Sequence, residues 1–134
     1  MRMLHRLRWA LCLGFLFSAF ASAAPLTEQQ KIDMLIHSVE TLPGAHFIRN
    51  GSSYDGKAAA DHLQAKRKYA GSHITTASDF IDKCASKSSM SGLPYQVQFA
   101  NGKTEEAGVF FHDELKQIEA SPTGSLSAGA ALAQ

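Results

Sequence analysis

The sequence is poor in cysteine. Its 134 residues contain two cysteines, and Cys12 lies in an apolar stretch near the N-terminus. If that stretch is removed, Cys84 is left alone, which excludes an intrachain disulfide. Cys84 falls on the apolar stripe of an expected helix, so a buried, inert thiol is predicted. A redox role is the alternative.

Motifs of catalysis and metal binding are also absent. The histidines form neither H-x-x-x-H nor H-E-x-x-H, and no G-x-S-x-G elbow occurs. Serine catalysis in the polar run 86–91 would need Lys83 or Lys87 to lose its proton through burial, and both lysines stand beside polar residues. We therefore predict no catalytic residue, no metal site and no cofactor.

Long apolar runs are missing as well. The longest, Trp9 to Phe20, is shorter than the about 20 residues of a membrane-spanning helix. It follows three arginines and precedes Ala21-Ser22-Ala23, which is the order of a cleavable signal peptide. We predict cleavage after Ala23, because a cut after Ala24 would leave the rigid Pro25 next to it. A retained membrane anchor is the alternative. No lipid anchor is expected, because Cys12 lies inside the apolar run.

Cleavage would leave a small soluble periplasmic protein. The mature chain would carry ten basic against twelve acidic residues, a net charge of −2. This charge gives no general attraction to nucleic acid or anionic lipid, so neither a nucleic-acid partner nor a membrane anchor is expected after cleavage. Residues 24–120 are predicted to form a single globular domain. Residues 121–134, which are rich in Ala, Ser and Gly, are predicted to be a disordered tail.

The apolar periodicity of residues 24–120 predicts an α+β fold that is mostly helical, with about four helices and a small antiparallel β-hairpin or short sheet. Helices are expected from Thr27 to the Pro43-Gly44 stop, over 53–70, over 75–85 and over 108–120. Strands are expected over 46–49, 94–100 and 103–106, with a two-residue turn at Asn101-Gly102. Thr27-x-x-Gln30 and Thr76-x-x-Asp79 are expected to cap two of the helices.

Several blocks of the sequence resemble a known family. They are FIRNGSSY (47–54), AADHLQAK (59–66), TASDFIDKCASKSSMSGLPY (76–95) and the later FF (110–111). The order and spacing of these blocks resemble a family of small exported bacterial proteins classed as a domain of unknown function. The resemblance covers about residues 26–119. It implies a periplasmic location and no established activity, and it gives no catalytic residue to carry over.

Polar residues of these blocks are the candidate binding residues. They are Arg49, Asn50, Tyr54, His62, Lys66, Ser88, Ser89 and Tyr95. His62 and Lys66 stand four residues apart on an expected helix, so they share a face that could hold an anion. Arg49 precedes a turn and a helix start, where backbone N–H groups could bind a carboxylate or phosphate. In the structural alternative His62 only packs, Lys66 extends to solvent, and Ser53 caps the helix after a turn at Asn50-Gly51.

The sequence therefore favours a non-catalytic binding or interaction module, whose partner is an unknown envelope protein or a small ligand. One alternative is a small envelope hydrolase with His62 as general base. Another is an inhibitor or stress-related envelope protein. The hydrolase requires a cleft beside His62 and a hydroxyl or carboxylate within hydrogen-bond reach. The binding hypothesis gains most if the regions of Arg49, His62 and Ser89 converge.

Overall fold

The computed structural model describes residues 24–121. In chain order the elements are α1 (Glu28–Thr41), β1 (His46–Arg49), β2 (Ser52–Tyr54), α2 (Gly56–Ala70), the 3-10 turn η1 (Gly71–His73), α3 (Ala77–Phe80), the π-helical turn η2 (Ile81–Ala85), β3 (Gln96–Gln98), β4 (Thr104–Glu106) and α4 (Ala107–Ala120). The prediction of an α+β, mostly helical fold is confirmed. The predicted signal peptide, residues 1–23, and the predicted tail from residue 122 lie outside the described residues. No helix of the described range is long and apolar enough to cross a membrane.

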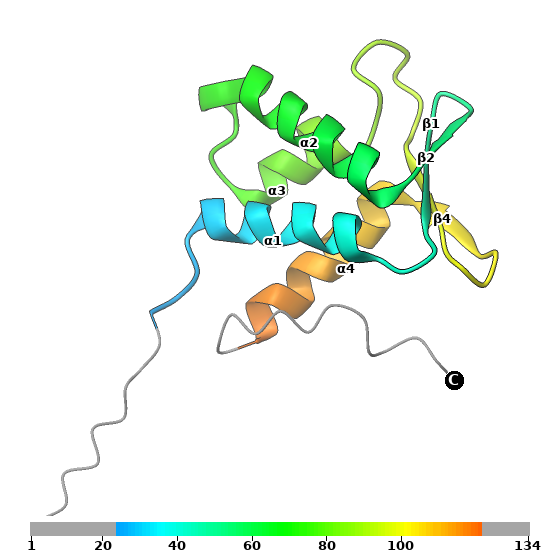
Figure 1. Ribbon diagram of the computed structural model, residues 1–134. Helices are drawn as coiled ribbons and strands as arrows, with labels where there is room; N and C mark the ends of the chain where they lie inside the picture. The colour runs from blue at the N-terminus through cyan, green and yellow to red at the C-terminus, as the bar shows by residue number, and fades with distance from the viewer. Residues whose placement is uncertain (1–23, 122–134) are drawn as a thin grey trace, which may run out of the picture.

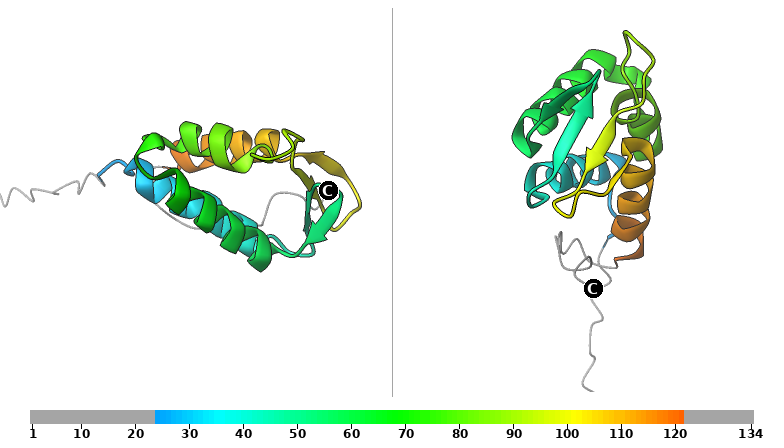
Figure 2. Two further views of the ribbon diagram at one scale, coloured as in Figure 1. Left: turned by 90° about the horizontal axis from the view of Figure 1, so that it is seen from above. Right: turned by 90° about the vertical axis from the view of Figure 1, so that its right-hand side faces the viewer.

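The helices gather behind one face of a small sheet. Helix α1 lies alongside α2 and also contacts α3 and α4 (Figure 1). Seen from above, the sheet lies at one end of the helices (Figure 2, left). Seen from the right-hand side of Figure 1, its strands lie across the helix ends (Figure 2, right). The largest fully buried side chains come from α1, α3, η2, β3 and α4: Phe80, Phe111, Ile32, Leu35, Ile81, Val39, Val97 and Cys84.

Both predicted capping boxes are present. The Thr27 hydroxyl accepts a hydrogen bond from the Gln30 N–H at 3.2 Å, and the Gln30 side chain accepts one from the Thr27 N–H at 2.8 Å. The same reciprocal pair joins Thr76 and Asp79 at the start of α3. Each box satisfies backbone donors that the first helical turn leaves unpaired.

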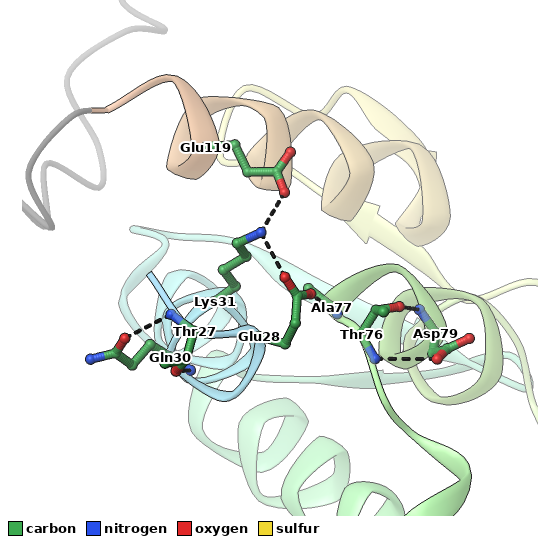
Figure 3. A network of polar contacts seen from close by, with 8 residues as sticks. All are labelled: Thr27, Glu28, Gln30, Lys31, Thr76, Ala77, Asp79 and Glu119. Atoms are coloured by element: carbon green, nitrogen blue, oxygen red, sulfur yellow. Dashed lines mark hydrogen bonds and ion pairs between the residues drawn. The ribbon is translucent and has the colours of Figure 1, made fainter. Parts of the chain in front are cut away.

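A polar network joins three helices at their ends (Figure 3). Lys31 of α1 binds Glu28 and, across to α4, Glu119, with both Nζ–Oε1 distances at 2.8 Å. Glu28 also accepts the Ala77 N–H, the first free donor of α3, at 2.8 Å. The Glu28 carboxylate of α1 therefore acts as a cap for α3 and joins the two helices.

The sheet has the order β2-β1-β3-β4, and every pair is antiparallel. Strands β1 and β2 form a hairpin in which Arg49 faces Ser52 across Asn50 and Gly51. Both turn residues have positive φ, 50° and 79°, as a two-residue type I′ turn requires. The predicted strand at 46–49 is confirmed, and it joins β3 as well.

The expected helix start at Ser53 is wrong. Ser53 lies in β2 opposite Ile48, because the Asn-Gly turn returns the chain into a second strand before any helix begins. Helix α2 begins at Gly56, and the Asp55 side chain caps it by accepting the Ala58 N–H at 2.8 Å. Asp55 therefore has the role that the sequence assigned to Ser53.

Two further boundaries differ from the prediction. The β3–β4 turn contains three residues, Ala100 to Gly102, because Phe99 still pairs with Lys103 and Gly102 adopts a positive φ of 85°. This is the hairpin turn with a glycine bulge rather than the two-residue form. Ser121, which the sequence predicts as the first residue of the tail, caps α4 by donating from its N–H and hydroxyl to the Gln117 carbonyl.

The helix expected over 75–85 changes form midway. Residues Ala77–Phe80 are α-helical and Ile81–Ala85 are π-helical. The Ser86 hydroxyl donates to the Ile81 carbonyl, five residues earlier, at 2.8 Å, which stabilises the wider turn. Cys84 lies in this turn and is 1% exposed, so the prediction of a buried thiol is confirmed. Burial raises the pKa of Cys84, which disfavours the reactive thiolate.

Candidate functional site

Candidate residues from four parts of the chain meet at the end of the molecule where the sheet lies. Arg49 and Tyr54 are the last residues of β1 and β2, and Tyr95 directly precedes β3. His62 and Lys66 lie one turn apart on α2. Hydrogen bonds join these five side chains into one group, the Arg49–Lys66 cluster (Arg49, Tyr54, His62, Lys66, Tyr95).

Arg49 is held by two partners. Its Nη1 lies 2.6 Å from Nδ1 of His62, and its Nη2 donates to the Tyr54 hydroxyl at 3.1 Å. The guanidinium carbon lies 4.7 Å from the centre of the Tyr54 ring, a cation–π distance. The hairpin turn brings Tyr54 back beside Arg49, so the β1–β2 pairing fixes the direction of the guanidinium.

The bonding partners of His62 define its protonation state. Arginine only donates hydrogen bonds, so Nδ1 of His62 must accept and the ring must be neutral. The single ring proton is then on Nε2, which donates to the Tyr95 hydroxyl at 3.2 Å. Partial burial lowers the pKa of His62, and the charges of Arg49 and Lys66 lower it further. Geometry and charge thus both favour a neutral ring, and the contact with Arg49 selects the tautomer protonated on Nε2.

Lys66 completes the cluster. Its Nζ donates to the Lys87 carbonyl at 3.0 Å and to the Tyr95 hydroxyl at 3.3 Å, and it lies 5.0 Å from the centre of the Tyr95 ring. Burial lowers the pKa of Lys66, with Arg49 adding to the effect. Burial raises the pKa of Tyr95, so its hydroxyl stays protonated. Tyr95 therefore accepts from two donors and keeps its own proton for another acceptor.

The serine-rich loop 86–94 is attached to the same end of the molecule. Asn50 donates to the Ser88 hydroxyl at 3.4 Å and accepts from the Ser91 hydroxyl at 2.6 Å. Ser88 is 5% exposed and accepts from the backbone N–H groups of Met90 and Ser91 at 3.3 Å. The β1–β2 turn and this loop, which Figure 1 shows side by side, are thus joined through Asn50.

Ser89 differs from the other candidates. It is exposed, and its side chain makes none of the hydrogen bonds found in residues 24–121. Ser91, which the sequence did not single out, makes the bond to Asn50 instead. The four serines of the loop look alike in sequence, and only the fold distinguishes the buried Ser88 and the bridging Ser91 from the free Ser89.

A small cavity opens beside the cluster. Its volume is about 140 Å³. Arg49, Tyr54, His62 and Tyr95 form its polar side. Its other walls are Phe47, Ile48, Ala58, Ala59, Leu63, Ala85, Ala107 and Phe111. The arrangement of these residues around a space depends on packing between α2, η2, the sheet and α4.

The cations of the cluster lack acidic partners. Among the described residues, Lys31, Lys57, Arg67, Lys83, Lys103 and Lys116 each lie within 4.0 Å of a carboxylate. Within the same range, neither Arg49 nor Lys66 has such a contact. The cluster therefore carries positive charge that no side chain of residues 24–121 neutralises directly. In this range no three His, Cys, Asp or Glu side chains lie close enough together to hold a metal ion.

Fold and site together define a small α+β protein with a cationic cluster beside an apolar cavity. The chain belongs to the family of unknown function DUF5329, which it matches over residues 26–119. This confirms the resemblance drawn from the sequence blocks. The chain is also 35% identical over 68 residues to the uncharacterized protein YfeK of Salmonella typhimurium, a match that covers 51% of this chain and 57% of YfeK. No solved structure matches significantly. Neither the description of the family nor the name of YfeK states an activity.

Proposed function

We propose that this protein is an exported, non-catalytic binding module that holds an anionic group at the Arg49–Lys66 cluster. The observation that carries the proposal is the pair of cations, Arg49 and Lys66, that converge with no carboxylate within 4.0 Å in the described residues. Partly buried charge is costly unless it is paired. A bound anion would supply the missing partner.

Unused hydrogen-bond donors support the same function. A guanidinium has five N–H donors, and Arg49 directs two of them to His62 and Tyr54. An ammonium has three, and Lys66 directs two of them to Lys87 and Tyr95. Charge-assisted bonds to a carboxylate or phosphate are stronger than those between neutral groups. The cluster thus offers donors to an anion without breaking its existing bonds.

The hydrolase alternative fits the geometry less well. His62 does border a cavity and has the Tyr95 hydroxyl within reach, as that hypothesis requires. A general base, however, needs a free lone pair. The only lone pair of neutral His62 is directed at Arg49, 2.6 Å away. No contact of the described residues specifically favours the inhibitor or stress-related alternatives.

Binding of acetate tests the proposal. The protein purified from cells is titrated with sodium acetate at constant ionic strength, and binding is followed by NMR shifts of the α2 amides. The variants Arg49→Gln and Lys66→Gln each remove one charged donor, so each should weaken acetate binding about tenfold or more. Lys68→Gln on the same helix removes an exposed lysine outside the cluster and should bind acetate as the wild type does.

Folding of each variant is checked first by its thermal melt and amide spectrum. Arg49→Lys keeps the charge with fewer donors and should bind acetate with intermediate strength. If the wild type binds no acetate, or if folded Arg49→Gln and Lys66→Gln variants bind it unchanged, the proposed function is wrong.

A further inference from the structure

We propose that the ligand is a compact aromatic monocarboxylate, whose carboxylate binds Arg49 and whose ring fills the apolar cavity beside the cluster. This inference rests on the proposed function, because it assigns the anionic group to a particular class of molecule. Three features of the cavity lead to it: its volume, its apolar walls and the charge along its edge.

The volume matches one aromatic ring. The cavity measures about 140 Å³. An apolar cavity of about 150 Å³ is known to stay dry and to bind benzene. A six-membered ring is therefore close to the largest rigid apolar group that the space accepts. A long alkyl chain or a fused ring system would exceed it.

The walls are apolar on the side away from Arg49. Phe47 and Leu63 are buried core residues, and Ala85 and Ala107 leave room because their side chains end at Cβ. Burial of an aromatic ring against these walls is favourable, whereas the hydroxyl groups of a sugar would be buried there without hydrogen-bond partners. The polar contacts are confined to one edge, so the bound molecule needs one charged end and one apolar end.

The charge of the cavity edge matches a single negative charge. Of the side chains that line the cavity, Arg49 is the one that is always cationic. His62 is neutral because Nδ1 accepts from Arg49. Lys66 does not line the cavity, so its ammonium acts on the same carboxylate from the cluster side and adds no second charge inside the cavity. A dianion such as a phosphate monoester would bury a second charge against apolar walls, which is unfavourable.

Isothermal titration of the purified protein with three probes tests the inference. Benzoate carries both the ring and the charge, acetate carries the charge alone, and benzyl alcohol carries the ring alone. Benzoate should bind at least tenfold more tightly than either of the others, because only benzoate uses both the cavity and Arg49.

Two variants on α2 test the place of binding. Ala58 lines the cavity and is exposed, so Ala58→Leu narrows the cavity at a position where a larger side chain leaves the core intact. It should reduce benzoate affinity at least fivefold and leave acetate affinity unchanged. Ala65→Leu makes the same substitution at an exposed site on α2 outside the cavity and should change neither affinity.

The outcomes separate the two proposals. If acetate binds through Arg49 but benzoate binds no more tightly, the aromatic ligand is wrong and the anion-binding function stands. If benzyl alcohol binds as tightly as benzoate, the ligand is not selected by charge and the inference is wrong. If benzoate and acetate both fail to bind, the inference and the proposed function fail together.

Discussion

Arg49 and His62 form a contact that depends on the protonation of the imidazole. Neutral His62 accepts from the guanidinium, whereas protonated His62 would have only donors and would face the cations Arg49 and Lys66. Burial raises the pKa of Tyr95, so the hydroxyl that accepts from His62 stays protonated near neutral pH. Acidification should therefore act on this contact first.

Because protonation of His62 would break its contact with Arg49, the stability of the protein should depend on pH. The folded state lowers the pKa of His62, so below about pH 6.5 the unfolded chain binds the proton more readily than the folded one. The free energy of unfolding should therefore decrease as the pH falls from 7.5 to 5. In His62→Gln that part of the decrease should be absent.

Urea unfolding at the two pH values measures the effect. His73→Gln, which changes an exposed histidine outside the cluster, is the matched control and should retain the full decrease. An equal loss of stability in the wild type and His62→Gln would contradict the neutral, Arg49-bound state of His62.

Most residues of the site could be predicted from the sequence, but few of the contacts between them could. The pairing of His62 with Lys66 followed from helical spacing, which is a local property. The contact of Arg49 with His62 depends on the hairpin and on the placement of α2 against β1, so sequence spacing could not predict it. The sequence points to Ser89 and not to Ser91, because a polar loop has no periodicity from which burial can be inferred.

Helix α2 is the element that positions the cluster, and its placement depends on a close approach to α1. A Cβ at Gly56 would lie 2.6 Å from the Val39 carbonyl oxygen and 3.0 Å from that of Glu40. Both atoms belong to the backbone of α1 and cannot move without shifting that helix. This constraint is not visible in the sequence, because Gly56 falls inside the range predicted as a continuous helix.

Substitution of Gly56 should therefore destabilise the protein. Gly56→Ala should reduce the free energy of unfolding by about 1–3 kcal/mol, because the added methyl group overpacks the α1–α2 contact. Lys57→Ala, at the next and exposed position, should change it by no more than about 0.5 kcal/mol. Urea unfolding compares the two variants. A Gly56→Ala variant as stable as the wild type would show that α1 and α2 pack less closely than described.

The predicted helices and strands also show which features can be predicted from neighbouring residues alone. Both capping boxes were predicted correctly, because a Thr and its partner three residues later lie within one turn. Strand β2 was missed because Ser52–Tyr54 is short and has no alternating apolar pattern. Its pairing is instead imposed by the Asn-Gly turn and by the partner strand β1.

At the scale of the whole molecule, we propose export and removal of the N-terminal segment. The arginines, the apolar run and the Ala21-Ser22-Ala23 site support cleavage after Ala23. Intact-mass measurement of the protein purified from its native host should then give a chain that begins at Ala24. Replacing Ala23 with Leu enlarges the residue at the cut and should cause the uncleaved chain to accumulate. A mature chain that retains Met1 to Ala23 would contradict the proposal.

An anion at the Arg49–Lys66 cluster is the central claim of this account, and the pKa of His62 in the presence of an anion tests it most directly. His62 lies 2.6 Å from Arg49, so a bound carboxylate would offset the positive charges that lower its pKa. NMR of the imidazole resonances is followed against pH with sodium acetate or with sodium chloride at the same ionic strength. The account predicts a higher His62 pKa in acetate than in chloride. The same His62 pKa in both salts would contradict it.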